Sequence, residues 1–151
     1  MTYEFKITRR VEFSETDMAG IMHYSNFFRF MESAEHGFYR SLGFSVVLAQ
    51  HTPPLGFPRV HAECDFKRPL RFEDMVEVHL LVREKKTRSI TYSFRFRNLS
   101  ADPVEEVARG SVTIVCVAMH PNGKMTAVPI PHEIARLIEP APPELLGSDH
   151  P

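Results

Sequence analysis

The chain has 151 residues, of which 43% are hydrophobic and 25% are charged, and its formal net charge is -1 at pH 7. This length fits one domain with a single core, and the composition is that of a globular protein. A net charge near zero gives no reason to expect nucleic acid or an anionic membrane as a partner. No segment approaches the ~20 apolar residues of a membrane-spanning helix, and the first residues lack a secretory signal. We expect a cytoplasmic protein without membrane insertion, in which Cys64 and Cys116 are reduced.

Alternating apolar and polar side chains predict a series of antiparallel strands. The first strand runs from about Tyr3 to Phe13, with Val11 and Phe13 on its inward side. The second strand is predicted to turn Val60, Ala62, Cys64 and Phe66 inward. Further strands are expected around residues 76–82, 89–97 and 107–118, with a short sixth strand at 124–128 after the Asn122-Gly123 turn.

One long helix interrupts the strands early in the chain, from about Tyr24 to Leu42. Apolar residues fall at the three-and-four spacing of a helix face, at Phe27, Phe30, Met31, Ala34, Phe38 and Leu42. Gly43 is a good stop for this helix. The opposite, polar face is predicted to carry Arg29, Glu32, Glu35, His36 and Arg40. A second helical stretch is expected from His132 to Ile138, and residues 43–58 are compatible with either a short helix or an irregular loop.

The run ahead of the long helix contains the best candidates for chemistry. A carboxylate such as Asp17 can attack a carbonyl or deprotonate water, and the unpaired N–H groups of a helix start can bind a developing oxyanion. Gly20 between them permits a sharp turn and leaves room for a substrate. Considered alone, Asp17 is an ordinary turn residue. The pattern alone makes Ser25 the residue that caps the helix.

Several residues of this run together resemble a known family. Thr16-Asp17, Gly20, His23-Tyr24 and Asn26, followed by a helix and antiparallel strands, resemble the 4-hydroxybenzoyl-CoA thioesterase-like family of hotdog-fold acyl-CoA thioesterases. The resemblance covers about residues 3–138. It implies an α+β hotdog domain at residues 1–138, in which an antiparallel sheet of five to six strands wraps around one long central helix. Residues 139–151 are then a proline-rich C-terminal tail.

The resemblance also implies an activity, the hydrolysis of an aromatic or short-chain acyl-CoA to the free acid and coenzyme A. Asp17 would act as nucleophile or as general base, and the backbone N–H of Tyr24 would polarise the thioester carbonyl. His23 would contact the acyl group or the thioester sulfur, although a helix cap is an equally good interpretation. No metal or organic cofactor is required.

The remaining site residues are expected to hold the substrate. Gly20, Asn26 and Phe28 are candidates for substrate contact, although a local structural role is favoured for Asn26. Glu32 and His36 are four residues apart, and a side-chain contact is favoured over a metal site. Basic residues near the turns are candidates for the phosphates of coenzyme A: Lys85, Lys86, Arg88, Arg68 and Arg71.

The expected assembly is a homodimer or homotetramer with the active site at the subunit boundary, because a lone sheet around one helix leaves an edge strand exposed. Two other functions remain open. One is a non-catalytic acyl-CoA binding or scaffold protein, since a fold alone does not establish catalysis. The other, which is disfavoured, is a hotdog hydratase or dehydratase, because Asp17 precedes the helix and His23 does not follow it at the spacing of that family.

Overall fold

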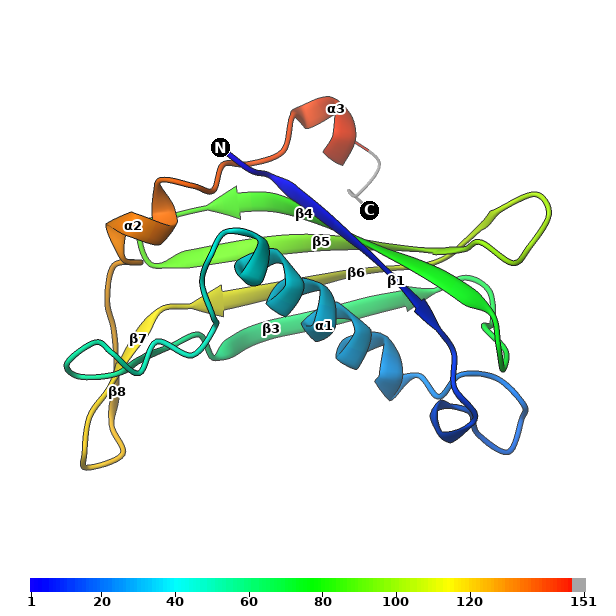
Figure 1. Ribbon diagram of the computed structural model, residues 1–151, viewed down its shortest axis with the longest axis horizontal. Coiled ribbons are helices and arrows are strands. Elements are labelled where there is room, and N and C mark those ends of the chain that lie inside the picture. The colour runs from blue at the N-terminus through cyan, green and yellow to red at the C-terminus, as the bar shows by residue number, and fades with distance from the viewer. Residues whose placement is uncertain (148–151) are drawn as a thin grey trace.

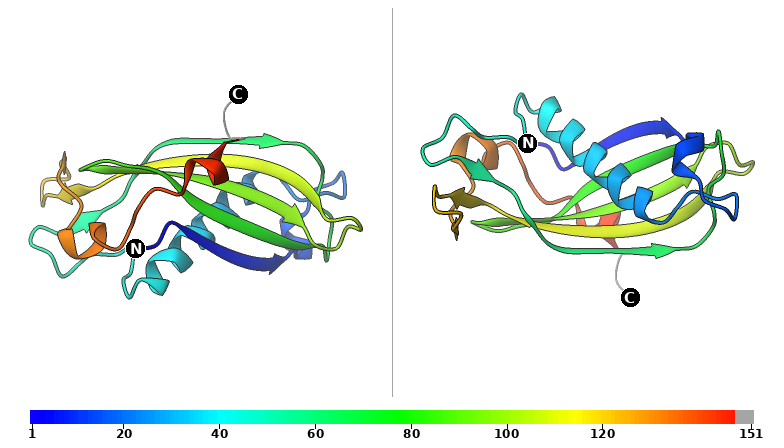
Figure 2. Two further views of the ribbon diagram at one scale, coloured as in Figure 1. Left: turned by 90° about the horizontal axis from the view of Figure 1, so that it is seen from above. Right: turned by 90° about the horizontal axis from the view of Figure 1, so that it is seen from below.

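The computed structural model describes residues 1–147 and contains one large antiparallel sheet (Figure 1). Its strand order is β1-β4-β5-β6-β3, and the strands are β1 (Glu4–Arg10), β3 (Arg59–Phe66), β4 (Met75–Lys85), β5 (Ser89–Asn98) and β6 (Glu105–Val115). The long helix α1 (Ser25–Ser41) lies across one face of this sheet, which curves around it (Figure 2). The predicted α+β hotdog arrangement is confirmed.

A second, small sheet accounts for the remaining strands. It has the order β2-β7-β8 and is made of β2 (Leu55–Gly56), β7 (Val117–Met119) and β8 (Met125–Ala127). The predicted strand at residues 107–118 is therefore divided at Cys116 between the two sheets. The predicted sixth strand exists as β8, but it pairs with β7 and not with the large sheet. Residues 43–58, which the sequence left open, form an irregular segment that carries β2.

Helix α1 follows from its apolar spacing. Phe30, Ala34 and Phe38 are fully buried, and they point from the helix into the sheet. The helix ends at Ser41 with Leu42 as its cap, and the predicted stop Gly43 follows with a φ of +87°, a conformation that other residues rarely adopt. The core opposite α1 is built from the inward residues of β4 and β5: Val76, Val78, Leu80, Val82, Ile90, Tyr92, Phe94 and Phe96.

The prediction for β3 is wrong with respect to burial. Val60 is 60% exposed and Phe66 is 48% exposed, and only Cys64 in this strand is half-buried. The reason is that β3 is the edge strand of the large sheet and has β6 as its one neighbour. Phe13 is also exposed, because β1 ends at Arg10 and residues Phe13–Glu15 form a 3-10 turn.

The C-terminal segment is more ordered than an extended tail. The short helix α2 (His132–Ala135) covers only part of the predicted helical stretch, and a further helix, α3 (Pro143–Leu146), follows it. The N–H of Ala141 donates to the carbonyl of Val82 at 2.7 Å, and the guanidinium of Arg95 donates to the carbonyl of Leu145. Residues 139–147 therefore pack on the sheet, while the rest of the predicted tail, residues 148–151, lies outside the described residues. No helix within residues 1–147 is both long and apolar enough to cross a membrane.

Candidate active site

Asp17 opens a tight turn between β1 and α1. Its N–H donates to the carbonyl of Ile21 at 2.9 Å, and the N–H of Gly20 donates back to the carbonyl of Asp17 at 2.9 Å. Gly20 has a φ of +78°, so the turn depends on glycine at this position. The Oδ1 atom of Asp17 accepts the N–H of Ala19 at 2.8 Å. This bond fixes the carboxylate in place, and no hydrogen bond within residues 1–147 engages its Oδ2 atom.

The start of α1 presents an unpaired backbone donor. The N–H of Ser25 donates to Nδ1 of His23 at 3.3 Å, and the N–H of Asn26 donates to the carbonyl of His23 at 2.9 Å. The N–H of Phe27 donates to the carbonyl of Tyr24 at 3.2 Å. The N–H of Tyr24, by contrast, donates no hydrogen bond within the described part of the chain. The first free N–H therefore belongs to Tyr24, which caps α1 in place of the Ser25 that the pattern nominated.

A single pocket contains both groups. Asp17 and Tyr24 line a surface cavity of about 460 Å³ at the N-terminal end of α1. Phe27 and Phe66 line it as well, with their rings edge to face at a centroid distance of 5.0 Å. The pocket is completed by Ile21, Met22, Lys67, Arg68, Pro69 and Leu70. Asp17, the N-cap residue Tyr24 of α1 and an apolar aromatic wall thus border one cavity.

Three other predicted residues support this pocket without lining it. The Nδ2 atom of Asn26 donates to the carbonyl of Glu15 at 2.8 Å, which fastens the helix start to the preceding turn. Nδ1 of His23 also lies 2.8 Å from Oγ of Ser25, and its ring stacks on Tyr24 at a centroid distance of 4.6 Å. At Gly20 the φ of +78° accounts for the glycine through the backbone turn, and within residues 1–147 the position that a Cβ would occupy is open.

Phe28 is the predicted substrate contact that the structure places elsewhere. It lines a different cavity, between α1 and the start of β3. Phe27, which the sequence assigned to the core, takes the expected position in the Asp17 pocket while remaining buried. Neighbouring residues of a helix point about 100° apart, so the direction of β3 relative to α1 decides which phenylalanine meets the pocket. The periodicity of the sequence does not predict how β3 is oriented relative to α1.

The basic residues fall into two groups at opposite ends of the sheet. Arg68 lines the Asp17 pocket, where its guanidinium also approaches Glu105 at 3.3 Å. Lys85 instead donates to the carbonyls of Ala135 at 2.9 Å and Ile138 at 2.7 Å. β4 has 11 residues, so about 33 Å separates Lys85 from its other end, which pairs with the end of β1 near Asp17.

Lys85, Lys86 and Arg88 are therefore not brought to the Asp17 pocket of the same chain. Lys85 fastens the C-terminal segment, and the Lys86 ammonium lies 3.4 Å from the Glu84 carboxylate. Arg71 is exposed near the pocket but does not line it.

The Glu32 and His36 side chains form a simple contact at 4.0 Å. Within residues 1–147 no group of three His, Cys, Asp or Glu side chains is arranged to hold a metal ion.

The fold and this pocket define the class, which is a hotdog-fold thioester hydrolase. The chain belongs to the thioesterase-like superfamily, whose family model matches residues 11–143. A relative from Aquifex aeolicus is 40% identical over 90 residues, which is 60% of this chain and 70% of the relative. The chain is 33% identical over 82 residues to a 1,4-dihydroxy-2-naphthoyl-CoA hydrolase of Parasynechococcus marenigrum, a match that spans 50% of this chain and only 54% of that relative.

Solved structures show the same architecture. A gentisyl-coenzyme A thioesterase superposes with a TM-score of 0.73 at 31% identity, over 87% of this chain and 97% of that one. A 1,4-dihydroxy-2-naphthoyl-CoA thioesterase from Synechocystis superposes with a TM-score of 0.75, over 98% of this chain and 99% of that one; at 23% identity this likeness shows the fold.

Proposed function

We propose that the protein hydrolyses an aromatic acyl-CoA thioester to the free carboxylic acid and coenzyme A. The observation that carries the proposal is that Asp17 and Tyr24 line one pocket, that the carboxylate of Asp17 is fixed by its turn, and that the N–H of Tyr24 has no hydrogen-bond partner within residues 1–147. A thioester carbonyl needs its oxygen stabilised and its carbon attacked, and these two groups supply both.

In the proposed reaction, the carbonyl oxygen accepts the N–H of Tyr24. The partial positive charge at the start of α1 adds to the stabilisation of the oxyanion. Acting as a general base, Asp17 takes a proton from a water molecule whose oxygen attacks the carbonyl carbon. The C–S bond then breaks, and the proton passes to the departing thiolate. This chemistry uses no metal or organic cofactor.

Asp17 acting as nucleophile gives the same products by a different route. Its carboxylate forms a C–O bond to the acyl carbon and releases the thiolate, and water then hydrolyses the resulting anhydride. In a single turnover in ¹⁸O-water, the nucleophilic route leaves ¹⁸O on Asp17 if water attacks the Asp17 carbonyl of the anhydride. The general-base route never labels the protein.

The lining of the pocket supports an aromatic acyl group. Edge-to-face aromatic contacts favour a ring, and Tyr24 and Phe27 each already make such a contact with Phe66. Relatives that act on a dihydroxynaphthoyl ester and on a gentisyl ester support a hydroxylated ring. Arg68, at the pocket and exposed, is the best-placed residue for a phosphate of coenzyme A.

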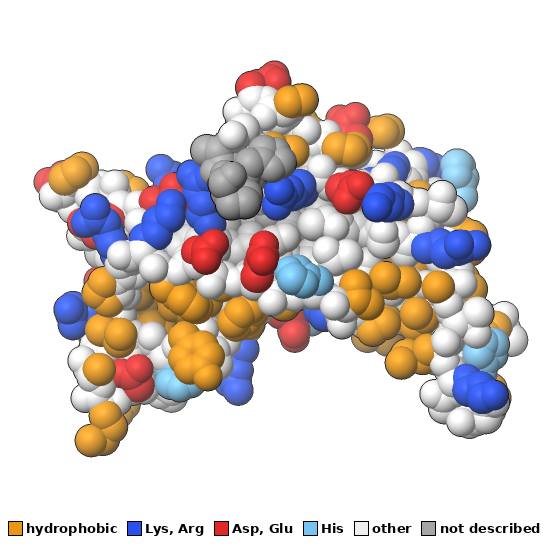
Figure 3. Space-filling model, turned by 180° about the vertical axis from the view of Figure 1, so that it is seen from behind, with side chains coloured by type: hydrophobic (Ala, Val, Ile, Leu, Met, Phe, Trp, Pro, Cys, Tyr) orange, Lys and Arg blue, Asp and Glu red, His pale blue; other side chains and the backbone are white. Residues whose placement is uncertain are grey.

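The exposed edge of the sheet supports a homodimer, either alone or as half of a homotetramer. β3 runs along the lower edge of the large sheet, and hydrophobic side chains gather along the lower edge of the molecule, beneath a band of charged ones (Figure 3). Val60 and Phe66 are exposed hydrophobic side chains of β3. Antiparallel pairing of two β3 edges would cover these side chains and continue the sheet across both subunits. Because Phe66 lines the Asp17 pocket, this interface would then border the active site.

The test is release of free thiol from a panel of aromatic and aliphatic acyl-CoA esters, followed with a chromogenic reagent. The Asp17→Asn variant retains the oxygen that accepts the Ala19 N–H, so its turn should persist while the charge is lost. We expect turnover to fall about 100-fold or more. Asp102→Asn, in an exposed loop that does not line the pocket, is the matched control and should retain full activity.

The same panel separates the competing functions. Tight binding of acyl-CoA without thiol release by the wild type would indicate a scaffold protein. Conversion of the acyl chain with the thioester left intact would indicate a hydratase or dehydratase. Thiol release that is equal in Asp17→Asn and in the wild type would show that the reaction takes place at another site.

A further inference from the structure

A second cavity lies between α1 and β3, away from Asp17. Its volume is about 160 Å³, similar to the ~150 Å³ engineered cavity that binds benzene. Much of its wall is apolar, made by Phe28, Met31, Ala62 and Val112. Phe94 and three charged residues, Glu32, Glu35 and Arg59, complete it. The cavity therefore has room for one aromatic ring and offers polar groups on one side.

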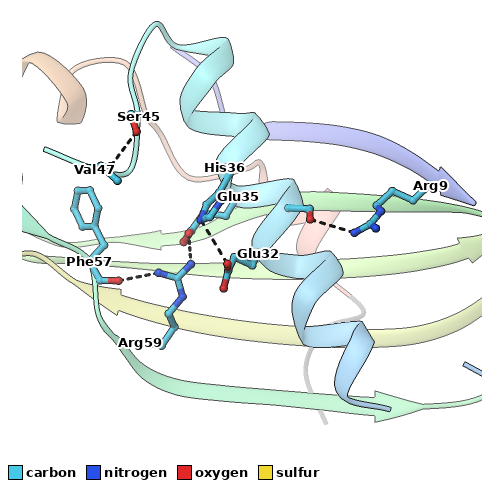
Figure 4. A network of polar contacts seen from close by, with 9 residues as sticks. Arg9, Glu32, Glu35, His36, Ser45, Val47, Phe57 and Arg59 are labelled. Carbon is cyan, nitrogen blue, oxygen red and sulfur yellow. Dashed lines mark hydrogen bonds and ion pairs between the residues drawn. The ribbon is translucent and has the colours of Figure 1, made fainter. Parts of the chain in front are cut away.

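Glu35 is the unusual member of this wall. The sequence placed it on the polar face of α1, but its side chain is only 2% exposed. One carboxylate oxygen accepts from the guanidinium of Arg59, which also donates to the carbonyl of Phe57 at 2.8 Å (Figure 4). The other oxygen, Oε2, is buried and has no hydrogen-bond partner within residues 1–147.

An unpaired buried oxygen is costly, and native proteins rarely retain one without a use. Burial also raises the pKa of the Glu35 carboxyl to about 7, against the opposing charge and hydrogen bond of Arg59. A group suited to Oε2 must donate a hydrogen bond and must sit among apolar side chains. A hydroxyl on an aromatic ring meets both requirements.

The two cavities belong to one stripe of α1 but lie far apart in a single chain. Glu35 follows Tyr24 by eleven positions, which corresponds to about 16 Å along the helix axis. A one- or two-ring acyl group bound at Tyr24 does not extend that far. The proposed pairing of two β3 edges changes this distance. A two-fold axis at the middle of β3 sets Phe66, at one end of the strand, opposite the partner's Arg59, at the other end.

We propose that Glu35, held by Arg59, is a specificity-determining residue that accepts a hydrogen bond from a ring hydroxyl of the acyl group. The acyl group bound at Asp17 of one subunit reaches the Glu35 cavity of the other. This inference rests on the proposed thioesterase function and on the dimer described with it. It assigns the Phe28 cavity to the far end of the substrate, so that Phe28 contacts the ring while Tyr24 binds the carbonyl.

The test compares substrates that differ by one hydroxyl, in the wild type and in Glu35→Gln. Hydroxybenzoyl-CoA esters with the hydroxyl at each ring position are compared with benzoyl-CoA by thiol release. At pH 8, where the Glu35 carboxyl with its pKa of about 7 is mostly ionised, we expect the wild type to prefer at least one hydroxylated ester by about 10- to 100-fold in kcat/KM, the range of a hydrogen bond to a charged group. In Glu35→Gln the ratio of kcat/KM for the hydroxylated ester to kcat/KM for benzoyl-CoA should fall to about 1. An equal fall for all esters would show a purely structural role and overturn the proposal.

A binding measurement makes the inference independent of turnover. In the Asp17→Asn background, the preference for a hydroxylated ester is measured by calorimetry with and without Glu35→Gln. A preference that depends on Glu35 supports the subsite even if the wild type releases no thiol, in which case only the proposed function fails. Should Glu35→Gln fail to fold, Asp17→Asn alone decides: equal affinity for every hydroxylated ester and for benzoyl-CoA overturns the proposal.

Discussion

Burial of Glu35 predicts a specific dependence of stability on pH. Desolvation raises its pKa in the folded protein from 4.5 to about 7, despite the nearby Arg59, with a smaller contribution in the same direction from Glu32. The folded state therefore favours the neutral carboxyl. A group whose pKa is raised on folding contributes stability below its unfolded pKa and loses it as the pH rises through the folded value. The stability that neutral Glu35 contributes is therefore lost as the pH rises from 4.5 to 8.

The size of the effect follows from the two pKa values. The difference between 4.5 and about 7 corresponds to about 3 kcal/mol, at 1.36 kcal/mol per unit. Glutamine has the same shape but does not ionise. Glu35→Gln therefore removes the pH dependence of stability that arises from Glu35 and leaves the contributions of the other ionisable groups in place. We expect the free energy of unfolding of the wild type, relative to Glu35→Gln, to fall by about 3 kcal/mol from pH 4.5 to pH 8.

Urea unfolding at several pH values measures this difference directly. Glu32→Gln is the matched control, because it removes a carboxylate from the same helix at an exposed position. Its difference from the wild type should vary much less with pH. The reasoning is refuted if the difference between the wild type and Glu35→Gln is constant with pH, or if the wild type gains relative stability as the pH rises. Either result would mean that Arg59 keeps Glu35 ionised throughout.

Three further predictions concern the turn, the basic residues and the edge strand. Gly20→Ala should lower the free energy of unfolding by about 1–2 kcal/mol, because alanine is strained at the φ of +78° that Gly20 adopts, although the added Cβ itself has room. Gly20→Asn should lower the free energy of unfolding by less, because asparagine adopts this conformation more readily. Arg68→Met should raise KM for acyl-CoA about 10-fold, because it removes a charge-assisted contact with a phosphate of coenzyme A. Lys85→Met should lower the free energy of unfolding and leave KM unchanged, because Lys85 fastens the C-terminal segment. The opposite pattern would contradict the assignment of Arg68 to phosphate binding. Light scattering should show no monomer of the wild type at micromolar concentration, but should show monomer for Val60→Lys.

The fold was largely predictable because its signals are periodic and local. The spacing of Phe30, Ala34 and Phe38 defines α1, and alternation defines β4 and β5. The burial of β3 was not predictable in the same way. Alternation indicates that one face of a strand is apolar, but position at the edge of a sheet decides whether that face is covered within one chain.

The candidate site was predictable where it depends on a contiguous motif. Asp17 and Tyr24 are close in sequence, and the turn between them keeps them at one pocket. Lys85 and Glu35 depend on contacts across the fold. Lys85 meets carbonyls about 50 residues further along the chain, and Glu35 is buried because β3 lies against that side of α1. A basic turn residue and a helical glutamate carry no local sign of either contact.

The central claim is that the N–H of Tyr24 stabilises the oxyanion formed on the thioester. Tyr24→Pro removes this hydrogen at a residue whose φ of -56° suits proline, and Tyr24→Ala removes the ring but keeps the hydrogen. The most direct measurement is therefore the ratio of the two kcat values on one aromatic acyl-CoA. We predict that Tyr24→Pro turns over about 100-fold or more slowly than Tyr24→Ala. Equal kcat values in two folded variants would contradict the mechanism.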